Sequence, residues 1–336
     1  MIPNSLEKAI YGVYATHSLH LADKHNVFAY LAEKGAASPG EIAKAVAVDG
    51  ETLERLMLVL GSLEIVQAGS DGTYRLREGV GPYLDKKDPR YVGGFMTHLI
   101  NSTSGRMGHL DAYLSRGKAV VDAALPSPFD AIYKDEASTK EFMDAMWQLS
   151  FDVSRELVTM AGLESCRQLV DVGGASGPFS VAALQHAREL RSTLFDLPKV
   201  GRYVEETRRT YGLEGRLQFV PGDFFREDLP EGDCFAFGYI LSDWDDATCL
   251  ELLRKAHRAC RAGGRVLVME RLFDEDKRGP FATVFMNLSM HVETQGRHRT
   301  AREYVGLLEA AGFRGCEVRR SSRDKHLVIG LKHVTT

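Results

Sequence analysis

Long apolar runs, an excess of basic residues and a secretory leader are all missing from this sequence, and each absence excludes a class of protein. No uninterrupted apolar stretch approaches the roughly 20 residues that a membrane-spanning helix needs. The first residues, Met1-Ile2-Pro3-Asn4-Ser5, contain no basic region followed by an apolar segment, so we expect no signal peptide. The formal net charge of −4 argues against a general binder of nucleic acids or membrane surfaces.

Cysteine is scarce, and its positions form no paired pattern. The five cysteines are Cys166, Cys234, Cys249, Cys260 and Cys316. Their number is odd and no two show Cys-x-x-Cys spacing, which argues against a disulfide framework and against a zinc cluster. We therefore expect reduced thiols in a cytoplasmic protein.

The sequence pattern divides the chain into a helical first part and an alternating second part. The length allows two domains with separate cores. We expect these domains at 1–95 and 156–336, joined by the segment 96–155. In the first domain, apolar residues recur at helical spacing over 5–34, and Ser38-Pro39 marks another helix start. The other expected elements there are the helices 40–47 and 51–63 and the hairpin strands 65–68 and 73–76. This order of helices and hairpin is a winged-helix pattern.

A winged helix often binds DNA, but the helix that would enter the groove is poorly suited to it. Residues 52–60 offer one base, Arg55, among mostly apolar side chains. Neutralising phosphates requires several Lys or Arg side chains on one face. We therefore expect this helix to be buried, and a DNA-binding regulator is the unfavoured alternative.

From residue 168 onward, predicted strands and helices alternate. The expected strands are 168–172, 192–195, 217–220, 234–241 and 265–269, and the expected helices are 179–189, 200–212, 246–262 and 301–311. Two last strands, 315–321 and 325–332, follow each other closely and should pair antiparallel. The expected fold class is α/β, a doubly wound, mostly parallel sheet with an antiparallel C-terminal strand and a separate N-terminal helical domain.

A glycine-rich turn, residues 173–177, follows the first of these strands and precedes a helix. Many such turns only allow close packing, but a helix N-terminus behind a glycine turn is also a ready site for a nucleotide-like ligand. In a doubly wound sheet, ligands bind at the carboxyl ends of the strands. The acids at those ends are Asp171, Asp196, Asp223, Asp243 and Glu270. Five acids beside one glycine turn favour a ligand site over simple helix capping.

The combination of motifs resembles a known family over nearly the whole chain. The motifs are Val-Asp-Val-Gly-Gly-Ala-Ser-Gly at 170–177, Phe-Asp-Leu-Pro at 195–198, Pro-Gly-Asp-Phe-Phe at 221–225, Ser-Asp-Trp-Asp-Asp at 242–246 and Gly-Arg-His-Arg-Thr at 296–300. They resemble the S-adenosylmethionine-dependent small-molecule O-methyltransferases of the caffeate and acetylserotonin type. The resemblance implies the class I methyltransferase sheet, S-adenosylmethionine as cofactor, and a homodimer formed through the N-terminal winged-helix domain.

The resemblance also implies which residues hold the cofactor. The glycine turn with Asp171, Gly173, Gly174 and Gly177 would hold the methionine part. Asp196 would hold the ribose, and Asp223 with Phe224 would hold the adenine. Leu197 and Ser242 complete the expected cofactor contacts.

One position departs from the family pattern. These enzymes usually carry a histidine immediately before the Asp-Trp pair as general base, and here that position is Ser242. The acid of the Glu-Arg-Thr motif is replaced by His298, whereas the acid after the fifth strand is kept as Glu270. An unassisted serine hydroxyl is a poor base near neutral pH. We therefore expect a catalytic set of His298, His291, Glu270, Asp243 and Ser242, in which His298 or His291 matters more than Ser242.

The acceptor side is less determined by the resemblance. The residues expected near the acceptor are His98, Met146, Trp147, Asn287, Met290 and His291, and His98 is a further candidate base. For Met146 and Trp147, core packing is the alternative interpretation. The acceptor is expected to be a small aromatic metabolite, first of all a phenol, in specialised metabolism such as antibiotic biosynthesis. Oxygen, nitrogen and ring carbon remain open as the methylated atom, and so does a relative that binds the cofactor without methylating.

The remaining expectations concern metals and partners. His291 and His298 are seven residues apart and Asp243 could join them, but a metal site needs three or more convergent ligands. Relatives with a metal would use the histidine that Ser242 replaces, so we expect no metal. The expected partners are an aromatic substrate and a second copy of the chain, without nucleic acid or membrane.

Overall fold

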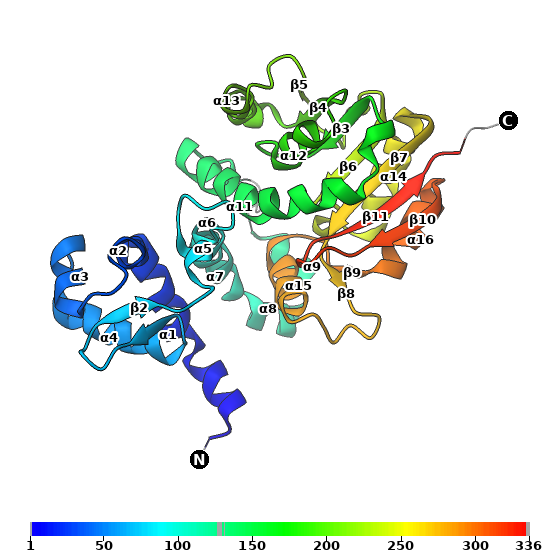
Figure 1. Cartoon of the computed structure of the whole chain (residues 1–336). Helices are drawn as coiled ribbons and strands as arrows, with labels where there is room; N and C mark the ends of the chain where they lie inside the picture. The colour runs from blue at the N-terminus through cyan, green and yellow to red at the C-terminus, as the bar shows by residue number, and fades with distance from the viewer. Residues whose placement is uncertain (1, 126–129, 131, 334–336) are drawn as a thin grey trace. The chain divides into compact units, whose positions relative to one another are not determined.

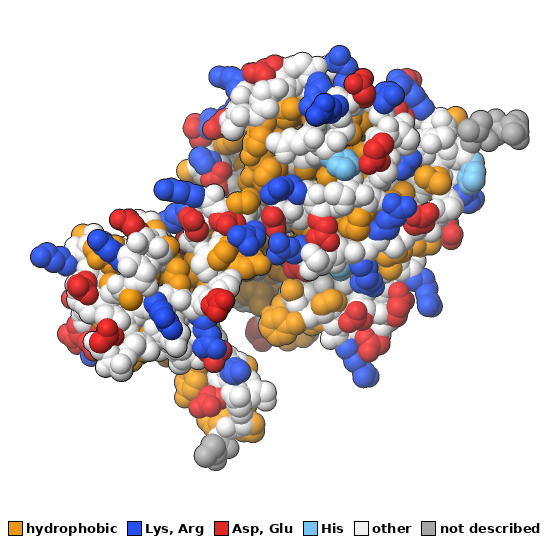
Figure 2. Space-filling model, viewed as in Figure 1, with side chains coloured by type: hydrophobic (Ala, Val, Ile, Leu, Met, Phe, Trp, Pro, Cys, Tyr) orange, Lys and Arg blue, Asp and Glu red, His pale blue; other side chains and the backbone are white. Residues whose placement is uncertain are grey.

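A computed structural model describes residues 2–125, 130 and 132–333 of the chain, which form two compact units, Met1–Thr97 and His98–Thr336 (Figure 1). No helix in these described ranges is long and apolar enough to cross a membrane. All five cysteines lie in the described ranges and are free thiols. On the face shown in Figure 2, basic and acidic side chains interleave over the surface.

The first unit has the expected order of helices and hairpin. Its elements are α1 (Asn4–Lys24), α2 (Val27–Lys34), α3 (Pro39–Val46), α4 (Gly50–Ser62), β1 (Val66–Ala68), β2 (Tyr74–Leu76) and α5 (Gly81–Leu84). The predicted cap at Ser38 is confirmed, because its Oγ accepts the Glu41 N–H at 3.3 Å and its own N–H donates to Glu41 Oε2 at 2.8 Å. The helical spacing over 5–34 is interrupted at Asn26, whose φ of 59° lies in the left-handed region that asparagine tolerates.

Helix α4 has the buried apolar face that the sequence predicts. Leu53, Met57 and Leu60 are buried in the core of the first unit. On its exposed side, Arg55 is paired with Glu51 at 2.9 Å. The one basic side chain of residues 52–60 is therefore already neutralised, which gives no support to the DNA-binding alternative.

The second unit begins with short helices and one long helix. These are α6 (Gly93–His98, which starts in the first unit), the π-helix η1 (Leu99–Thr103), α7 (Ser104–Met107), α8 (Leu110–Arg116), α9 (Lys118–Asp122) and α11 (Glu136–Met160). Asp135 caps α11, since its Oδ1 accepts the Ser138 N–H at 2.8 Å. Trp147 of α11 stacks on Phe151 at 4.8 Å and on Tyr211 at 5.6 Å, between ring centroids.

The sheet of the second unit is doubly wound, as predicted. Among the described residues its order is β10-β11-β7-β6-β3-β4-β5. The parallel strands are β3 (Gln168–Val172), β4 (Arg191–Asp196), β5 (Leu217–Pro221), β6 (Gly232–Gly238) and β7 (Cys260–Glu270); β11 (His326–Leu331) and β10 (Arg314–Arg319) are antiparallel. The α/β fold class with an antiparallel C-terminal strand is therefore confirmed.

Helices cover both faces of this sheet. They are α11, α12 (Pro178–His186), α13 (Gly201–Tyr211), α14 (Asp246–Ala259) and α16 (Ala301–Ala311). The unit also contains α15 (Phe281–Glu293), the short helices η2 (Leu163–Ser165), η3 (Pro198–Val200) and η4 (Leu241–Asp243), and the small parallel pair β8 (Leu272–Phe273) and β9 (Arg299–Thr300). Leu169 and Leu194 face a core with α11, α12 and α13, whereas Val170 and Phe235 face a core with α14 and α16 (Figure 1). Neighbouring strand residues thus alternate between two buried layers.

One predicted boundary was wrong in a place that matters for the site. The strand expected over 234–241 ends at Gly238, because Tyr239 turns the chain with a φ of 57°. The following residues enter η4, so Ser242 lies on a tight 3₁₀ turn beyond the strand. This turn points the 242–246 motif at the carboxyl edge of the sheet.

Candidate functional site

The strand order marks where a ligand binds. Strand β3 lies between β4 and β6, so the chain runs outward to β4 and β5 on one side and to β6 and β7 on the other. Such a switch point opens a crevice at the carboxyl ends of the central strands. The glycine turn follows β3, and the Ser242 turn follows β6. The sequence therefore brings its two most distinctive motifs to one edge.

The glycine turn has a geometry that side chains would obstruct. Gly173 has a φ of 67°, and a Cβ there would lie 2.4 Å from Ile240 Cδ1 and 3.6 Å from the Phe224 ring. A Cβ on Gly174 would lie 2.7 Å from the Asp171 carboxylate. Gly177, with a φ of 91°, directly precedes the N-terminal proline of α12. The bare backbone therefore forms a cradle before a helix N-terminus, which fits the predicted cofactor.

Asp171 supports the turn from below. It is the penultimate residue of β3 and not its last, and it is buried. Ser180 Oγ donates to Asp171 Oδ2 at 2.6 Å, and burial raises the pKa of Asp171 to about 6. This carboxylate lies under Gly174, so it holds the turn in shape; direct contact with a cofactor stays a prediction.

Asp196 lies at the carboxyl end of the neighbouring strand, as expected. Its Oδ2 accepts the Ala175 N–H at 2.9 Å, and its Oδ1 accepts the Leu197 N–H at 2.7 Å. Burial raises the pKa of Asp196 to about 6. The Ala175 bond ties the carboxylate directly to the glycine turn, so the residues expected to hold methionine and ribose form one hydrogen-bonded group.

The residues expected to hold an adenine lie beside this group. Asp223 Oδ1 accepts the Phe225 N–H at 2.9 Å, and Lys255 Nζ donates to the Phe224 carbonyl at 2.9 Å. The ring of Phe224 stands edge-on to Trp244, with 6.4 Å between centroids. An aromatic face thus borders the glycine turn, and the residues present fit a nucleoside-containing cofactor.

The acceptor side is built around the Ser242 turn. Ser242 is buried, and its N–H donates to Glu270 Oε1 at 3.1 Å. Burial raises the pKa of Glu270 to about 7, and Glu270 Oε2 has no hydrogen-bond partner among the described residues. Burial raises the pKa of Asp243 well above its ordinary value, and the charges of Glu270 and Glu293 add to the rise. Three carboxyl groups are therefore concentrated at this turn.

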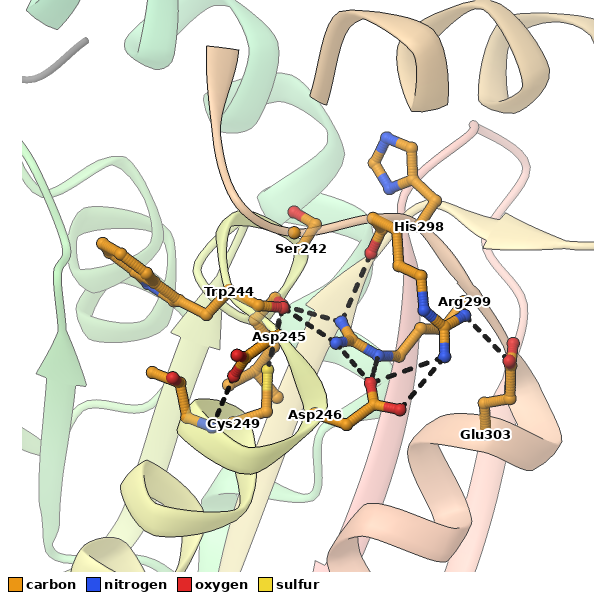
Figure 3. Close-up of polar contacts among 12 residues, drawn as sticks. Ser242, Trp244, Asp245, Asp246, Cys249, His298, Arg299 and Glu303 are labelled. Atoms are coloured by element: carbon orange, nitrogen blue, oxygen red, sulfur yellow. Dashed lines mark hydrogen bonds and ion pairs between the residues drawn. The ribbon is translucent and has the colours of Figure 1, made fainter. Parts of the chain in front are cut away.

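Arg299 clamps the turn in place, a role that sequence reasoning missed although the residue lies in a quoted motif. Its guanidinium is fully buried and donates to the carbonyl oxygens of Leu241 and Trp244 at 2.8 Å each and to Asp246 Oδ1 at 2.6 Å. Figure 3 shows these contacts converging on the 241–246 turn. Gly296 packs on the same turn, since a Cβ there would lie 2.0 Å from the Ser242 carbonyl oxygen.

His298 is an unfavourable proton acceptor in this structure. It is buried, and neither ring nitrogen has a hydrogen-bond partner among the described residues. Burial, with the nearby charges of Arg271 and Arg299, lowers its pKa to about 3. Its backbone N–H donates to Asn287 Oδ1 at 2.9 Å, so Asn287 holds the His298 segment. The predicted role of His298 as base receives no support from these surroundings.

His291 lies apart from the Ser242 turn. It is exposed on α15, and its ring stands edge-on to Tyr113 at 5.8 Å between centroids. The Tyr113 hydroxyl in turn donates to Asp122 at 2.8 Å. Met290, its neighbour, is half-buried. The described contacts join His291 to α8 and not to Ser242 or Glu270, which argues against its predicted role as base.

His98 is paired with an acid that sequence reasoning did not single out. Its Nε2 lies 3.8 Å from Glu293 Oε1, and both side chains are almost buried. Thr103 Oγ1 donates to the same Glu293 oxygen, and Ser289 Oγ donates to Glu293 Oε2 at 3.3 Å. Glu293 ends α15 three residues before Gly296, and that closeness to the fifth motif was the available signal.

The other residues expected near the acceptor divide between the two interpretations. Trp147 packs in the core with Phe151 and Tyr211, so packing explains it; Met146 on the same helix is half-buried. Tyr133, which was not predicted, is affected by charges from both halves of the site. Burial raises its pKa, and the charges of Asp196 and Asp243 add to the rise.

A buried lysine links the two halves of the site and was also missed. Lys325 lies directly before β11. Its Nζ donates to Ser150 Oγ at 3.2 Å and lies 3.8 Å from the centre of the Tyr239 ring. Burial lowers the pKa of Lys325 to about 8, and the charges of Glu270 and Asp171 oppose that shift. In the described ranges, no group of three His, Cys, Asp or Glu side chains could hold a metal ion.

Comparisons with known proteins agree with the geometry. A family profile described as the O-methyltransferase domain matches residues 109–314. Acetylserotonin O-methyltransferase of Gallus gallus is 33% identical over 290 residues, covering 83% of this chain and 83% of that protein. The 3-hydroxy-5-methyl-1-naphthoate 3-O-methyltransferase of Streptomyces sahachiroi is 29% identical over 311 residues, covering 92% of this chain and 89% of that protein.

A solved structure has the same fold along its whole length. Human N-acetylserotonin methyltransferase in complex with S-adenosylmethionine superposes with a TM-score of 0.89 at 27% identity, covering 99% of this chain and 100% of that one. The glycine cradle, the Asp196 group and the family profile therefore agree with the resemblance found in the motifs. The chain belongs to the S-adenosylmethionine-dependent O-methyltransferase family, and S-adenosylmethionine is its cofactor.

Proposed function

We propose that this enzyme transfers a methyl group to the hydroxyl of a small aromatic metabolite, with a phenol as the first choice. The observation that carries the proposal is the meeting of the glycine cradle and the carboxyl-rich Ser242 turn at one switch point. The names of relatives support an aromatic acceptor, because one acts on acetylserotonin and another on a hydroxynaphthoate. A place in specialised metabolism, including antibiotic biosynthesis, is part of the same proposal.

For the cofactor, we propose the residues that the resemblance implied. Gly173, Gly174 and Gly177 leave room for the methionine part, and the Asp196 carboxylate is available to ribose hydroxyls. Phe224 offers an aromatic face to the adenine. When bound, S-adenosylmethionine supplies an electrophilic methyl group, so the protein's main contribution is alignment of the acceptor and exclusion of water.

Because position 242 lacks the histidine, methylation of an aromatic nitrogen and of a ring carbon remain as two alternatives in the proposal. A phenol must lose its proton to become a good nucleophile, and Ser242 cannot take that proton efficiently near neutral pH. An aromatic nitrogen already carries a lone pair and needs little help from a base. A phenolate can also be methylated on its ortho carbon, which then has to lose a ring proton. Oxygen methylation is preferred because it is the reaction of the family.

Product analysis with methyl-labelled cofactor tests this function. The purified enzyme is incubated with methyl-¹³C S-adenosylmethionine and a panel of phenols, hydroxyindoles, hydroxynaphthoates and anilines. The ¹³C shift of the transferred methyl distinguishes oxygen, nitrogen and carbon products. An O-methyl product is expected. Cofactor binding without any labelled product across the panel would instead support a relative that does not methylate, and binding of neither cofactor nor acceptor would refute the proposal.

We further propose that residues 1–95 serve as a winged-helix dimerisation domain, followed by the helical segment 96–155 and the catalytic domain 156–336, in a cytoplasmic homodimer. Helix α1 supports this, because several large apolar side chains on it are exposed: Leu6, Ile10, Tyr11, Val13 and Tyr14. Exposed apolar groups of this size mark an interaction surface. The five free thiols fit a reducing compartment. Sedimentation as a monomer at micromolar concentration would contradict the homodimer.

A further inference from the structure

We propose that His98, held by Glu293, is the general base that removes the proton from the acceptor hydroxyl. The inference rests on the proposed function and names the residue that takes over from the histidine missing at position 242. It follows from the placement of four side chains on two segments, α6 with η1 and the end of α15. His98 would be a catalytic residue, and Glu293 a positioning residue.

The first observation is that two hydroxyl groups hold the Glu293 carboxylate beside His98. Thr103 Oγ1 donates to Oε1, Ser289 Oγ donates to Oε2 at 3.3 Å, and His98 Nε2 lies 3.8 Å from Oε1. Only 12% of the Glu293 side chain and 11% of the His98 side chain are exposed. A carboxylate held in this way orients an imidazole and stabilises the imidazolium that forms when the ring takes a proton.

The second observation is that the chain leading from Glu293 packs on the Ser242 turn. Gly296, three residues after Glu293, packs so closely that a Cβ on it would lie 2.0 Å from the Ser242 carbonyl oxygen. The charge of Glu293 acts on Asp243, the residue next to Ser242. The pair therefore belongs to the acceptor side of the site and not to a separate surface.

The third observation is an aromatic series that leads from His98 toward the cofactor side. The Phe142 ring stands edge-on to His98 at 5.8 Å and to Tyr133 at 6.4 Å. Tyr133 in turn is within the influence of both Asp196 and Asp243. A flat acceptor beside these rings would have its hydroxyl near a histidine, and apolar walls favour an aromatic ring.

The proton transfer balances without a further reactant. The acceptor O–H bond breaks, and a new N–H bond forms on the imidazole of His98. The electron pair stays on the phenolate oxygen, which becomes the nucleophile, and the imidazolium charge is met by the Glu293 carboxylate. The competing histidines are less suitable, since His298 is buried beside Arg271 and Arg299 and His291 packs against Tyr113.

The test compares His98→Gln and Glu293→Gln with the matched control His109→Gln, a half-buried histidine of the same region that has no part in the site. Catechol and 4-nitrocatechol are the paired acceptors, because the nitrophenol is already ionised at pH 8 and needs no base. For catechol, kcat/KM should fall about 10²–10⁴-fold in His98→Gln and about 10–10²-fold in Glu293→Gln. For 4-nitrocatechol, both losses should shrink below about tenfold, and His109→Gln should match the wild type with both acceptors.

A binding measurement separates a lost base from a damaged fold. Calorimetric titration with S-adenosylhomocysteine should give the same affinity for the wild type and all three variants. Equal losses with catechol and 4-nitrocatechol, or retained activity in His98→Gln, would overturn the assignment of the base while leaving the proposed function intact. If the wild type methylates no member of the acceptor panel, the proposed function itself fails, and the base with it. If His298→Gln alone shows the selective loss with catechol, the base is His298.

Discussion

The cofactor side and the acceptor side of this site are built in different ways. On the cofactor side, consecutive residues at the ends of β3 and β4 supply a bare backbone and one carboxylate, Asp196, tied to it by the Ala175 N–H. On the acceptor side, side chains come from α6, η1, η4, β7 and α15, and they meet only in the folded chain. By the resemblance of the motifs, the first side keeps the residues expected of the family, whereas the second departs from them at Ser242 and His298.

The difference follows from what each side must recognise. A cofactor shared by a whole family can be bound by backbone geometry, which few substitutions are able to imitate. An acceptor and its proton need side chains of particular chemistry, and those can be supplied from several positions. A catalytic base can therefore move from one segment to another while the cofactor cradle stays unchanged.

The largest effect is expected at Lys325, which the two sides share. Its ammonium lies within the influence of both Asp171 and Glu270, and all three are buried. At pH 7, below the Lys325 pKa of about 8, the lysine is mostly charged, and Lys325→Met leaves two buried carboxyl groups without their cation. The free energy of unfolding at pH 7 should therefore fall by about 3–5 kcal/mol. Denaturant melts measure this loss. Lys44→Met, on an exposed position of α3, should change stability by less than about 0.5 kcal/mol, and adding Glu270→Gln to Lys325→Met should restore part of the loss.

The next largest effect should be a loss of cofactor affinity that leaves the acceptor side unchanged. Asp196→Ala removes a buried carboxylate that accepts two backbone N–H groups and is proposed to bind the ribose. The affinity for S-adenosylmethionine should fall about 10²–10³-fold, as expected for two or more charge-assisted hydrogen bonds. Calorimetric titration measures it. Glu293→Gln should keep the wild-type affinity; an equal loss in both variants would show that the two sides are not independent.

A smaller effect should break the acceptor side alone. In Gly296→Ala, the new Cβ would meet the Ser242 carbonyl oxygen and the Asp243 carbonyl carbon at 2.0 and 2.4 Å, so the turn must move. Because a displacement of about 1 Å can cost 10²-fold in rate, methyl transfer should fall about 10- to 10²-fold. Gly306→Ala is the matched control, since a Cβ there has no neighbour within 4 Å. Wild-type kinetics in Gly296→Ala would mean that the turn's position does not govern the acceptor.

The smallest effect concerns the pH dependence of stability at His298. In the folded protein the pKa of His298 is about 3, below the ordinary 6.5. Between these pH values the unfolded chain binds a proton at His298 and the folded protein does not. The contribution of neutral His298 to the free energy of unfolding is therefore complete above pH 6.5 and decreases as the pH falls toward 3. Between pH 7 and 5 the wild type should lose about 2 kcal/mol from this residue. Thermal melts at both pH values should show a smaller decrease in His298→Gln, and an identical decrease would contradict the assignment.

The cofactor side could be predicted from the sequence because its residues are local. Gly173, Gly177 and Asp196 stand next to strands with strong apolar patterns, and parallel strands carry their ends to one edge. The same logic placed Asp223 and Phe224 beside them. The predicted end of the strand that contains Cys234 was wrong, because the apolar pattern does not indicate a positive φ at Tyr239.

The acceptor side could not be predicted in the same way. Neither Glu293 nor Lys325 belongs to one of the five motifs that carry the resemblance. Their roles depend on neighbours about 190 and 175 residues away in the chain, Thr103 and Ser150. No periodicity links such positions.

The sequence by itself determined the alternating α/β order, the glycine cradle with its strand-end acids, and the absence of the usual base at Ser242. The tertiary structure decided which histidine has an acidic partner, which is shielded beside arginines, and which is exposed on a helix. The physical reason is that backbone geometry and hydrophobic periodicity are local properties of a chain. The protonation of a side chain, in contrast, depends on its burial and on charges brought to it by distant segments.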